Sequence, residues 1–157
     1  MNEKIEILKK EHESCNVHAD RIEKALAEIA KFSPLSIDKI QNMNTQELAV
    51  TELLTGRFAK LQDAIGEKIF PLILINIGED IKGRSFIDRL NLLEKLGYIN
   101  DAGHWFDYRN ARNAVSHEYP DSPELMLKNL TEILSLAKEL LEYWKKLDKK
   151  IKQIISQ

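Results

Sequence analysis

The chain has 157 residues, of which 31% are charged and 43% hydrophobic, with only six glycines and four prolines. These proportions predict one helical domain, residues 1–157, with a sizeable core, and argue against disordered, collagen-like and sandwich-type chains. The net charge of −2 excludes a global positive field for nucleic-acid or membrane binding, so any RNA-binding surface must be local.

The N-terminal segment and the single cysteine bear on the cellular compartment. Residues 1–11 lack the apolar core of a secretory signal. The longest nearly unbroken apolar run, Ile69 to Ile77, is far shorter than the ~20 residues that span a bilayer. Cys15 has no partner for an intramolecular disulfide, which fits a reducing compartment. We therefore expect a cytoplasmic protein without a membrane segment.

Hydrophobic periodicity predicts a long first helix. Apolar or small side chains recur three or four residues apart from Ile5 to Ile29, which is the pattern of one helical stripe. Ser33-Pro34 ends this helix, because the residue before a proline is disfavoured in helical geometry. A connection with one short helical turn near Ile37 is expected to follow.

A second helix is predicted to begin at a capping pair formed by Asn44 and Glu47. Its apolar stripe continues to Ile69, and Pro71 is expected to kink or end it. Residues 72–77 have the composition of a short buried strand, but a lone strand has nothing to pair with. A continued, fully buried helix is therefore favoured for this run.

The second half of the chain predicts three more helices. Ser85 caps a short helix that Gly97 closes. The next helix is expected to be capped at residues 100–101 and to end at Pro120. Ser122-Pro123 starts the last helix, whose apolar face is wide enough to contact more than one neighbour. The predicted fold class is all-α, an up-and-down bundle of four to five main helices.

Most of the chain's chemistry lies near the end of the penultimate predicted helix. Helical spacing places Arg109, Arg112 and Asn113 on one face, because they are three and four residues apart. Within eleven positions the segment carries two arginines, an amide, a hydroxyl, an imidazole, a carboxylate and a phenol: Arg109, Arg112, Asn113, Ser116, His117, Glu118 and Tyr119.

An arginine and a histidine together can transfer phosphoryl groups without a metal. Arg112 can hold a phosphate, and His117, near the negative end of the helix dipole, can exchange protons near neutral pH. A regular helix separates the two by about 140° around its axis, so Pro120 is expected to loosen the last turn and let His117 approach. The alternative is a surface helix end with incidental ion pairs to Asp107 and Glu118.

The spacing of these residues resembles a known signature. Residues 112–119 read R-N-x-x-x-H-x-Y. Three other stretches accompany this motif: R-F-A-K-L-Q-D at 57–63, E-K-I-F-P at 67–71 and D-R-L-N-L-L-E-K-L-G at 88–97. Together they resemble the HEPN (higher eukaryotes and prokaryotes nucleotide-binding) domain family, in the R-x4-H-x-Y form of its HepT-type toxins. The resemblance covers about residues 48–133, and the first helix matches only in character.

The resemblance implies a homodimer with two R-x4-H motifs in a shared cleft, and a metal-independent endoribonuclease without a cofactor. Carried over to matching positions, Arg112 stabilises the transition state and His117 is the general base or acid. Asn113 orients His117 or binds the phosphate, while Arg109 lies outside the core motif and is assigned phosphate or dimer contacts. Tyr119 matches the tyrosine that a nucleotidyltransferase antitoxin adenylylates, which would block the cleft.

These expectations describe the toxin of a toxin–antitoxin pair that cleaves RNA. Some members of the family serve instead as non-catalytic partner subunits of a minimal nucleotidyltransferase, and the motif does not decide between the two functions. A purely structural helical bundle is a third interpretation.

The remaining histidines and the C-terminal lysines are expected to be structural. His12, Cys15 and His18 lie three residues apart on the first helix, a spacing that offers no convergent trio for a metal. His104, beside Trp105 in the sequence, is expected to have a packing role rather than a chemical one. The lysines at 145–152 complement the dipole of the last helix and solvate its end, with an RNA-binding patch as the alternative.

Overall fold

The regular elements of the chain are helical, as the sequence predicts. The computed structural model describes residues 2–115 and 121–157, and no strand occurs among them, so the all-α bundle is confirmed. In chain order the elements are α1 (Glu3–Ala30), α2 (Ile37–Gln41), α3 (Thr45–Ala64), the π-helical turn η1 (Ile65–Ile69), α4 (Phe70–Asn76), α5 (Phe86–Lys95), α6 (Trp105–Val115) and α7 (Pro123–Ile155).

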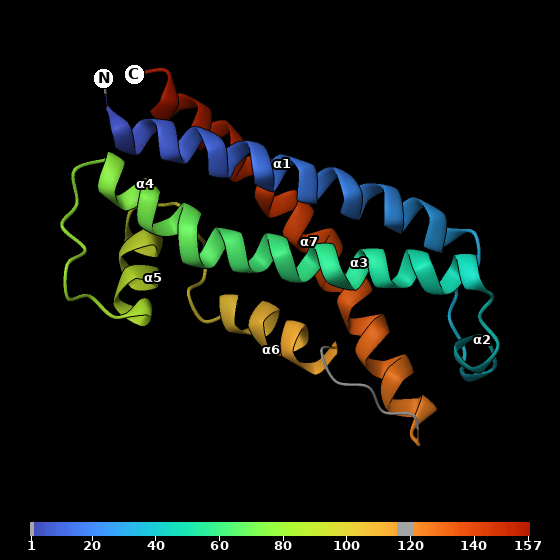
Figure 1. Cartoon of the computed structure of the whole chain (residues 1–157). Helices are drawn as coiled ribbons and strands as arrows, with labels where there is room; N and C mark the ends of the chain where they lie inside the picture. Colours follow the sequence, from blue (N-terminus) through green and yellow to red (C-terminus); the bar gives the residue numbers. More distant parts are fainter. Residues whose placement is uncertain (1, 116–120) are drawn as a thin grey trace.

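Three long helical segments frame the bundle. α1 lies along the continuous α3–α4 segment, and α7 crosses this pair diagonally (Figure 1). The shorter α6 packs against α3 and α7, and α5 contacts α4. The start of α1 and the end of α7 lie at the same end of the bundle (Figure 1). One cluster of buried side chains draws on each of these helices, so α6 is held from two sides by the core.

The apolar stripes of the sequence form this core. Most of the predicted apolar face of α7 is buried, while Leu127 and Leu134 on that face are half-buried. The predicted residues that are buried are Leu130, Ile133, Leu136, Ala137, Leu140, Leu141, Trp144, Leu147 and Ile151. Leu48 and Ile87 belong to apolar stripes that were expected to face the core. The prediction is wrong for both residues, since Leu48 is 48% exposed and Ile87 is 55% exposed. In the part of the chain that the structure describes, no helix is both long and apolar enough to cross a membrane.

Helix boundaries follow the predicted capping residues. The capping box is confirmed: Asn44 Oδ1 accepts from the backbone N–H of Glu47 at 2.8 Å, and Glu47 Oε1 accepts from that of Asn44 at 3.0 Å. Ser85 and Ser122 cap α5 and α7 as expected. Gly97, with φ of 86°, follows α5 in the left-handed conformation that ends helices. Local sequence therefore determines most helix ends.

The helix does not end at Pro71, because a π-helical turn precedes the proline and connects α3 to α4. In η1 the backbone N–H of Phe70 donates to the carbonyl of Ile65, five residues back. We infer that this wider turn makes room for a proline ring that would otherwise crowd the preceding carbonyls. The predicted continuation of the helix is confirmed, but the prediction that residues 72–77 are fully buried is wrong, since only Ile73 and Leu74 are buried.

The start of α6 differs from the prediction. The helix begins at Trp105, several residues after the expected cap at 100–101. Asp101 instead accepts a hydrogen bond from the backbone N–H of Gly103 at 2.9 Å, which closes a turn before the helix. The predicted end at Pro120 lies outside the described residues.

Gly56, in the middle of α3, offers a direct test of helix energetics. It is exposed, and a Cβ added there would meet nothing within 4 Å. We expect Gly56→Ala to stabilise the protein by about 0.5–1 kcal/mol, because alanine loses less backbone entropy in a helix. This corresponds to a rise of about 2–4 °C in Tm at most, measured by thermal denaturation. Gly97→Ala is the matched control and should lower Tm, since its φ of 86° disfavours a side chain.

Candidate functional site

Three of the five predicted site residues lie on α6. Arg109, Arg112 and Asn113 are described, and they share the face of α6 that the sequence predicts. His117 and Tyr119 lie outside the described residues. Arg109, Arg112 and Asn113 form the arginine half of the motif.

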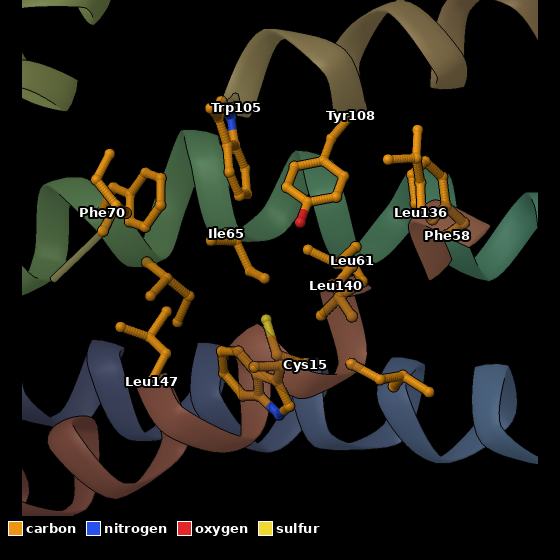
Figure 2. Close-up of a cluster of buried hydrophobic side chains, with 14 of the residues drawn as sticks. Cys15, Phe58, Leu61, Ile65, Phe70, Trp105, Tyr108, Leu136, Leu140 and Leu147 are labelled. Atoms are coloured by element: carbon orange, nitrogen blue, oxygen red, sulfur yellow. The ribbon is translucent and has the colours of Figure 1, made fainter. Parts of the chain in front are cut away.

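Buried side chains on the neighbouring face of the helix, two of them aromatic, hold α6 in place. Trp105, Tyr108 and Ala111 are 3%, 5% and 3% exposed. Trp105 and Tyr108 point from α6 toward the side of α3 and the cluster beneath it (Figure 2). The rings of Trp105 and Phe70 have centroids 4.9 Å apart. Since this face is anchored in the core, the polar face that carries Arg109 and Asn113 is turned outward.

The polar face of α6 forms one wall of a cleft with a volume of about 420 Å³. The other walls come from the end of α3, the π-helical turn η1 and the first residue of α5. The lining residues are Gln62, Asp63, Gly66, Glu67, Phe86, Arg109, Arg112 and Asn113. All three described residues of the predicted site therefore meet in one cleft, and its volume is within the range of small-molecule sites.

Asp63 holds Arg112 by a two-point ion pair. Arg112 Nε donates to Asp63 Oδ1 at 3.2 Å and Nη2 donates to Oδ2 at 3.0 Å. The hydrogen bonds, and then the charge of Asp63, raise the pKa of Arg112. Nη1 lies on the other edge of the guanidinium, 3.5 Å from Asn113 Oδ1. Asp63 engages Nε and Nη2, and Asn113 accepts from Nη1, so two of the five guanidinium N–H groups have no partner among the described residues and can face an anion in the cleft.

Arg109 interacts with aromatic rings instead of a carboxylate in the described structure. Its guanidinium carbon Cζ lies 4.8 Å from the centroid of the Phe86 ring and 5.9 Å from that of Phe106. The two phenylalanine rings meet edge to face, at 6.2 Å and 85°. The phosphate or dimer contact expected for Arg109 stays a prediction.

Five cleft residues were not predicted from the sequence, and three of them, Asp63, Glu67 and Phe86, contribute charge or an aromatic ring. Asp63, Glu67 and Phe86 line the cleft but lie 26 to 49 positions before Arg112. Asp63 and Glu67 fall in or at the edge of two stretches that accompany the motif, R-F-A-K-L-Q-D and E-K-I-F-P, and this was the available signal. No local pattern links Phe86 to the motif. With these residues included, two arginines face two carboxylates, so the lining is formally neutral.

The π-helical turn brings the backbone of Gly66 close to the anchor of α6. A Cβ added at Gly66 would lie 3.2 Å from Trp105 Nε1 and 3.4 Å from its Cζ2, so the indole packs directly against the glycine. Trp105 Nε1 is buried, and the described residues offer it no hydrogen-bond partner. π turns inside helices often accompany functional sites. Here the turn places Gly66 in the cleft lining and under the Trp105 ring at once.

A larger cavity of about 490 Å³ lies elsewhere, between the segment before α6 and the middle of α7. Its lining contains His104, Trp105 and Tyr108 but none of the predicted site residues. His104 bridges two carboxylates, Asp107 at 2.8 Å and Glu139 at 3.1 Å, and packs on the Tyr108 ring. We place the candidate site in the smaller cleft, because it holds the convergent arginine and amide groups.

His12 and His18 have structural partners, and Cys15 is a buried free thiol. His12 Nε2 lies 2.5 Å from Asp148 Oδ1, which ties α1 to α7. His18 contacts Arg57 at 3.0 Å, and burial followed by this positive neighbour lowers its pKa. Burial raises the pKa of Cys15 to about 12, so its thiol is protonated near neutral pH. None of the three side chains points to a shared ligand.

The C-terminal lysines are partly engaged within the protein. Lys145 pairs with Glu142 at 3.3 Å, and Lys152 pairs with Asp148 at 3.0 Å. Lys150 donates to the carbonyl of Gly97. These contacts support the structural interpretation over an RNA-binding patch on this helix.

Comparison with models of known protein families, with curated proteins and with solved structures found no match. The functional assignment therefore depends on the motif residues and on the cleft. The arginine half of the motif lines an open cleft, fixed by a carboxylate from α3 and anchored by the aromatic face of α6.

Proposed function

We propose that this protein is the toxin of a toxin–antitoxin pair: a homodimeric, metal-independent endoribonuclease of HepT type. The observation that carries the proposal is the placement of Arg112. It lines an open cleft beside Asn113 and is held there by Asp63 at 3.2 and 3.0 Å. A preorganised guanidinium that keeps free donors is the group that stabilises negative charge on a phosphate during transfer.

The chemistry follows from the two motif residues. The ribose 2′-oxygen attacks the adjacent phosphorus, the bond from phosphorus to the 5′-oxygen breaks, and a 2′,3′-cyclic phosphate forms. His117 serves as the base that takes the 2′ proton or as the acid that protonates the leaving oxygen. Arg112 stabilises the charge that builds on the phosphoryl oxygens. In the homodimer, the second copy contributes another arginine and histidine to a shared cleft.

Regulation in this proposal comes from a partner nucleotidyltransferase. The partner adenylylates Tyr119, two residues after His117 in the sequence. The added nucleotide brings bulk and negative charge next to the catalytic groups, and RNA is then excluded from the cleft.

The test is cleavage of RNA by the purified protein in excess EDTA, beside His117→Ala. The parent is expected to produce fragments with 2′,3′-cyclic phosphate ends, and His117→Ala is expected to produce none. Intact mass must first show that Tyr119 carries no nucleotide. An unmodified parent that leaves RNA intact, or a His117→Ala variant that cleaves as fast as the parent, contradicts the proposal.

Asp63 is expected to act as a positioning residue for Arg112. Removing its carboxylate in Asp63→Ala frees the guanidinium to leave the cleft wall, and misplacement of a catalytic group costs up to about 10²-fold. We expect kcat for RNA cleavage to fall about 10- to 100-fold with little change in KM. Because both side chains are 36% exposed, the pair adds no more than about 1 kcal/mol to stability, so Tm should change little.

Two variants separate positioning from general charge effects in this experiment. Asp63→Glu keeps the carboxylate and should restore part of kcat. Glu67→Gln removes a negative charge from the same cleft but keeps a side-chain oxygen that can accept hydrogen bonds, and it should leave kcat within a few-fold of the parent. If Glu67→Gln matches Asp63→Ala, the effect comes from the cleft's charge and not from the position of Arg112.

The alternative is a non-catalytic subunit that serves a minimal nucleotidyltransferase. One observation favours it: two carboxylates offset the two arginines of the cleft, which weakens attraction for RNA. A stable complex with such an enzyme, together with no RNA cleavage by the unmodified protein, would support this function. RNA turnover by the isolated protein would exclude it.

A further inference from the structure

The stack of Arg109 on Phe86 has no role in the motif chemistry described above. Phe86 is the first residue of α5, so the helix start presents its ring to the cleft. Arg109 Cζ lies 4.8 Å from the centroid of that ring, and the Phe86 and Phe106 rings meet edge to face with centroids 6.2 Å apart. Phe86 is half-buried and Arg109 is exposed, so both groups present part of their surface to solvent.

Building on the proposed function, we propose that this Phe86–Arg109 stack is a nucleobase subsite. One base stacks on the surface formed by the Phe86 ring and the Arg109 guanidinium, while the phosphate of the same nucleotide binds Arg112. Aromatic rings and guanidinium planes are the surfaces on which proteins stack unpaired bases. Phe86 and Arg109 line the same cleft as Arg112, so one cleft can bind both the base and the phosphate.

The spacing along α6 fits one nucleotide. Arg109 and Arg112 are three residues apart on the helix, which separates their Cβ atoms by about 5–6 Å. Both side chains therefore enter the cleft from the same side of α6, where one nucleotide can contact both. The cleft, with a volume of about 420 Å³, has room for the base and the phosphate.

The wall formed by α3 and η1 offers hydrogen-bond acceptors to a stacked base. Gln62 and Glu67 line the same cleft, and their side-chain oxygens can accept from an exocyclic amino group. Asp63 is engaged by Arg112, so Glu67 is the carboxylate better placed for this contact. A base with an amino group, such as adenine, is therefore the appropriate probe.

The experiment compares two ligands that differ only by the base: adenosine 5′-monophosphate and ribose 5-phosphate. Calorimetric titration of the full chain should show adenosine 5′-monophosphate binding about 5- to 100-fold more tightly, the range expected for one stacked base. Phe86→Leu, which keeps apolar volume but removes the ring, should bring this ratio close to one. Phe86→Tyr keeps the ring and should keep the ratio.

Arg112→Ala serves as the second control, because it should weaken both ligands by the same factor and leave their ratio unchanged. A ratio near one in the parent, no measurable binding of either ligand, or an unchanged ratio in a folded Phe86→Leu variant overturns the subsite. RNA cleavage in EDTA with the same preparations separates the two proposals. Base-dependent binding without cleavage contradicts only the nuclease, and cleavage without base-dependent binding contradicts only the subsite.

Discussion

Arg112→Ala is expected to lower the rate of RNA cleavage by about 10²- to 10³-fold, the effect of removing one preorganised donor from a transition state. The physical reason is geometric. Asp63 holds the Nε–Nη2 edge of the guanidinium at 3.2 and 3.0 Å, so the side chain needs no reorganisation when charge develops on the phosphate. The measurement is single-turnover cleavage of an RNA of defined sequence in EDTA.

Two further variants test the geometric explanation for Arg112. Arg112→Lys keeps the positive charge but loses the two-point fork to Asp63, so it should recover only a small part of the lost rate. Arg84→Ala removes an exposed arginine outside the cleft and should cleave as the parent does. Full activity in Arg112→Lys would mean that charge alone suffices, and full activity in Arg112→Ala would exclude Arg112 from catalysis.

Trp105→Ala is expected to destabilise the protein by about 3–5 kcal/mol, the usual cost of truncating a large buried aromatic side chain. Trp105 is 3% exposed, and its ring packs near Phe70, Tyr108 and Tyr143 at centroid distances of 4.9, 5.4 and 6.2 Å. The alanine variant leaves a cavity between α6 and η1. Urea denaturation followed by circular dichroism measures the free energy of unfolding.

Trp105→Phe is the matched control. It keeps a ring in the same place and removes an indole N–H that is buried without a hydrogen-bond partner among the described residues. Because that donor is desolvated without compensation, its loss offsets part of the lost packing. The cost should therefore fall to about 1–2 kcal/mol. A loss below about 1 kcal/mol in Trp105→Ala would mean that the indole does not anchor α6.

Local sequence was sufficient for the helices and most of their ends. Asn44 and Glu47 form the predicted capping box, and Gly97 ends α5 with the expected positive φ, because each depends on residues within one turn. The π-helical turn before Pro71 was not predicted. The contact between Gly66 in this turn and Trp105, 39 positions later in the chain, could not be predicted from local sequence either.

The candidate site also has one part that the sequence predicted and one part that only the tertiary structure revealed. The sequence alone placed Arg109, Arg112 and Asn113 on one face of a helix, because a spacing of three and four residues is a property of the helix itself. Only the tertiary structure paired Arg112 with Asp63 and set Phe86 against Arg109. These contacts join α6 to α3 and α5 across 49 and 23 positions of the chain. Periodicity within a helix determines which face a residue occupies, whereas the packing of buried Trp105 and Tyr108 determines what that face meets.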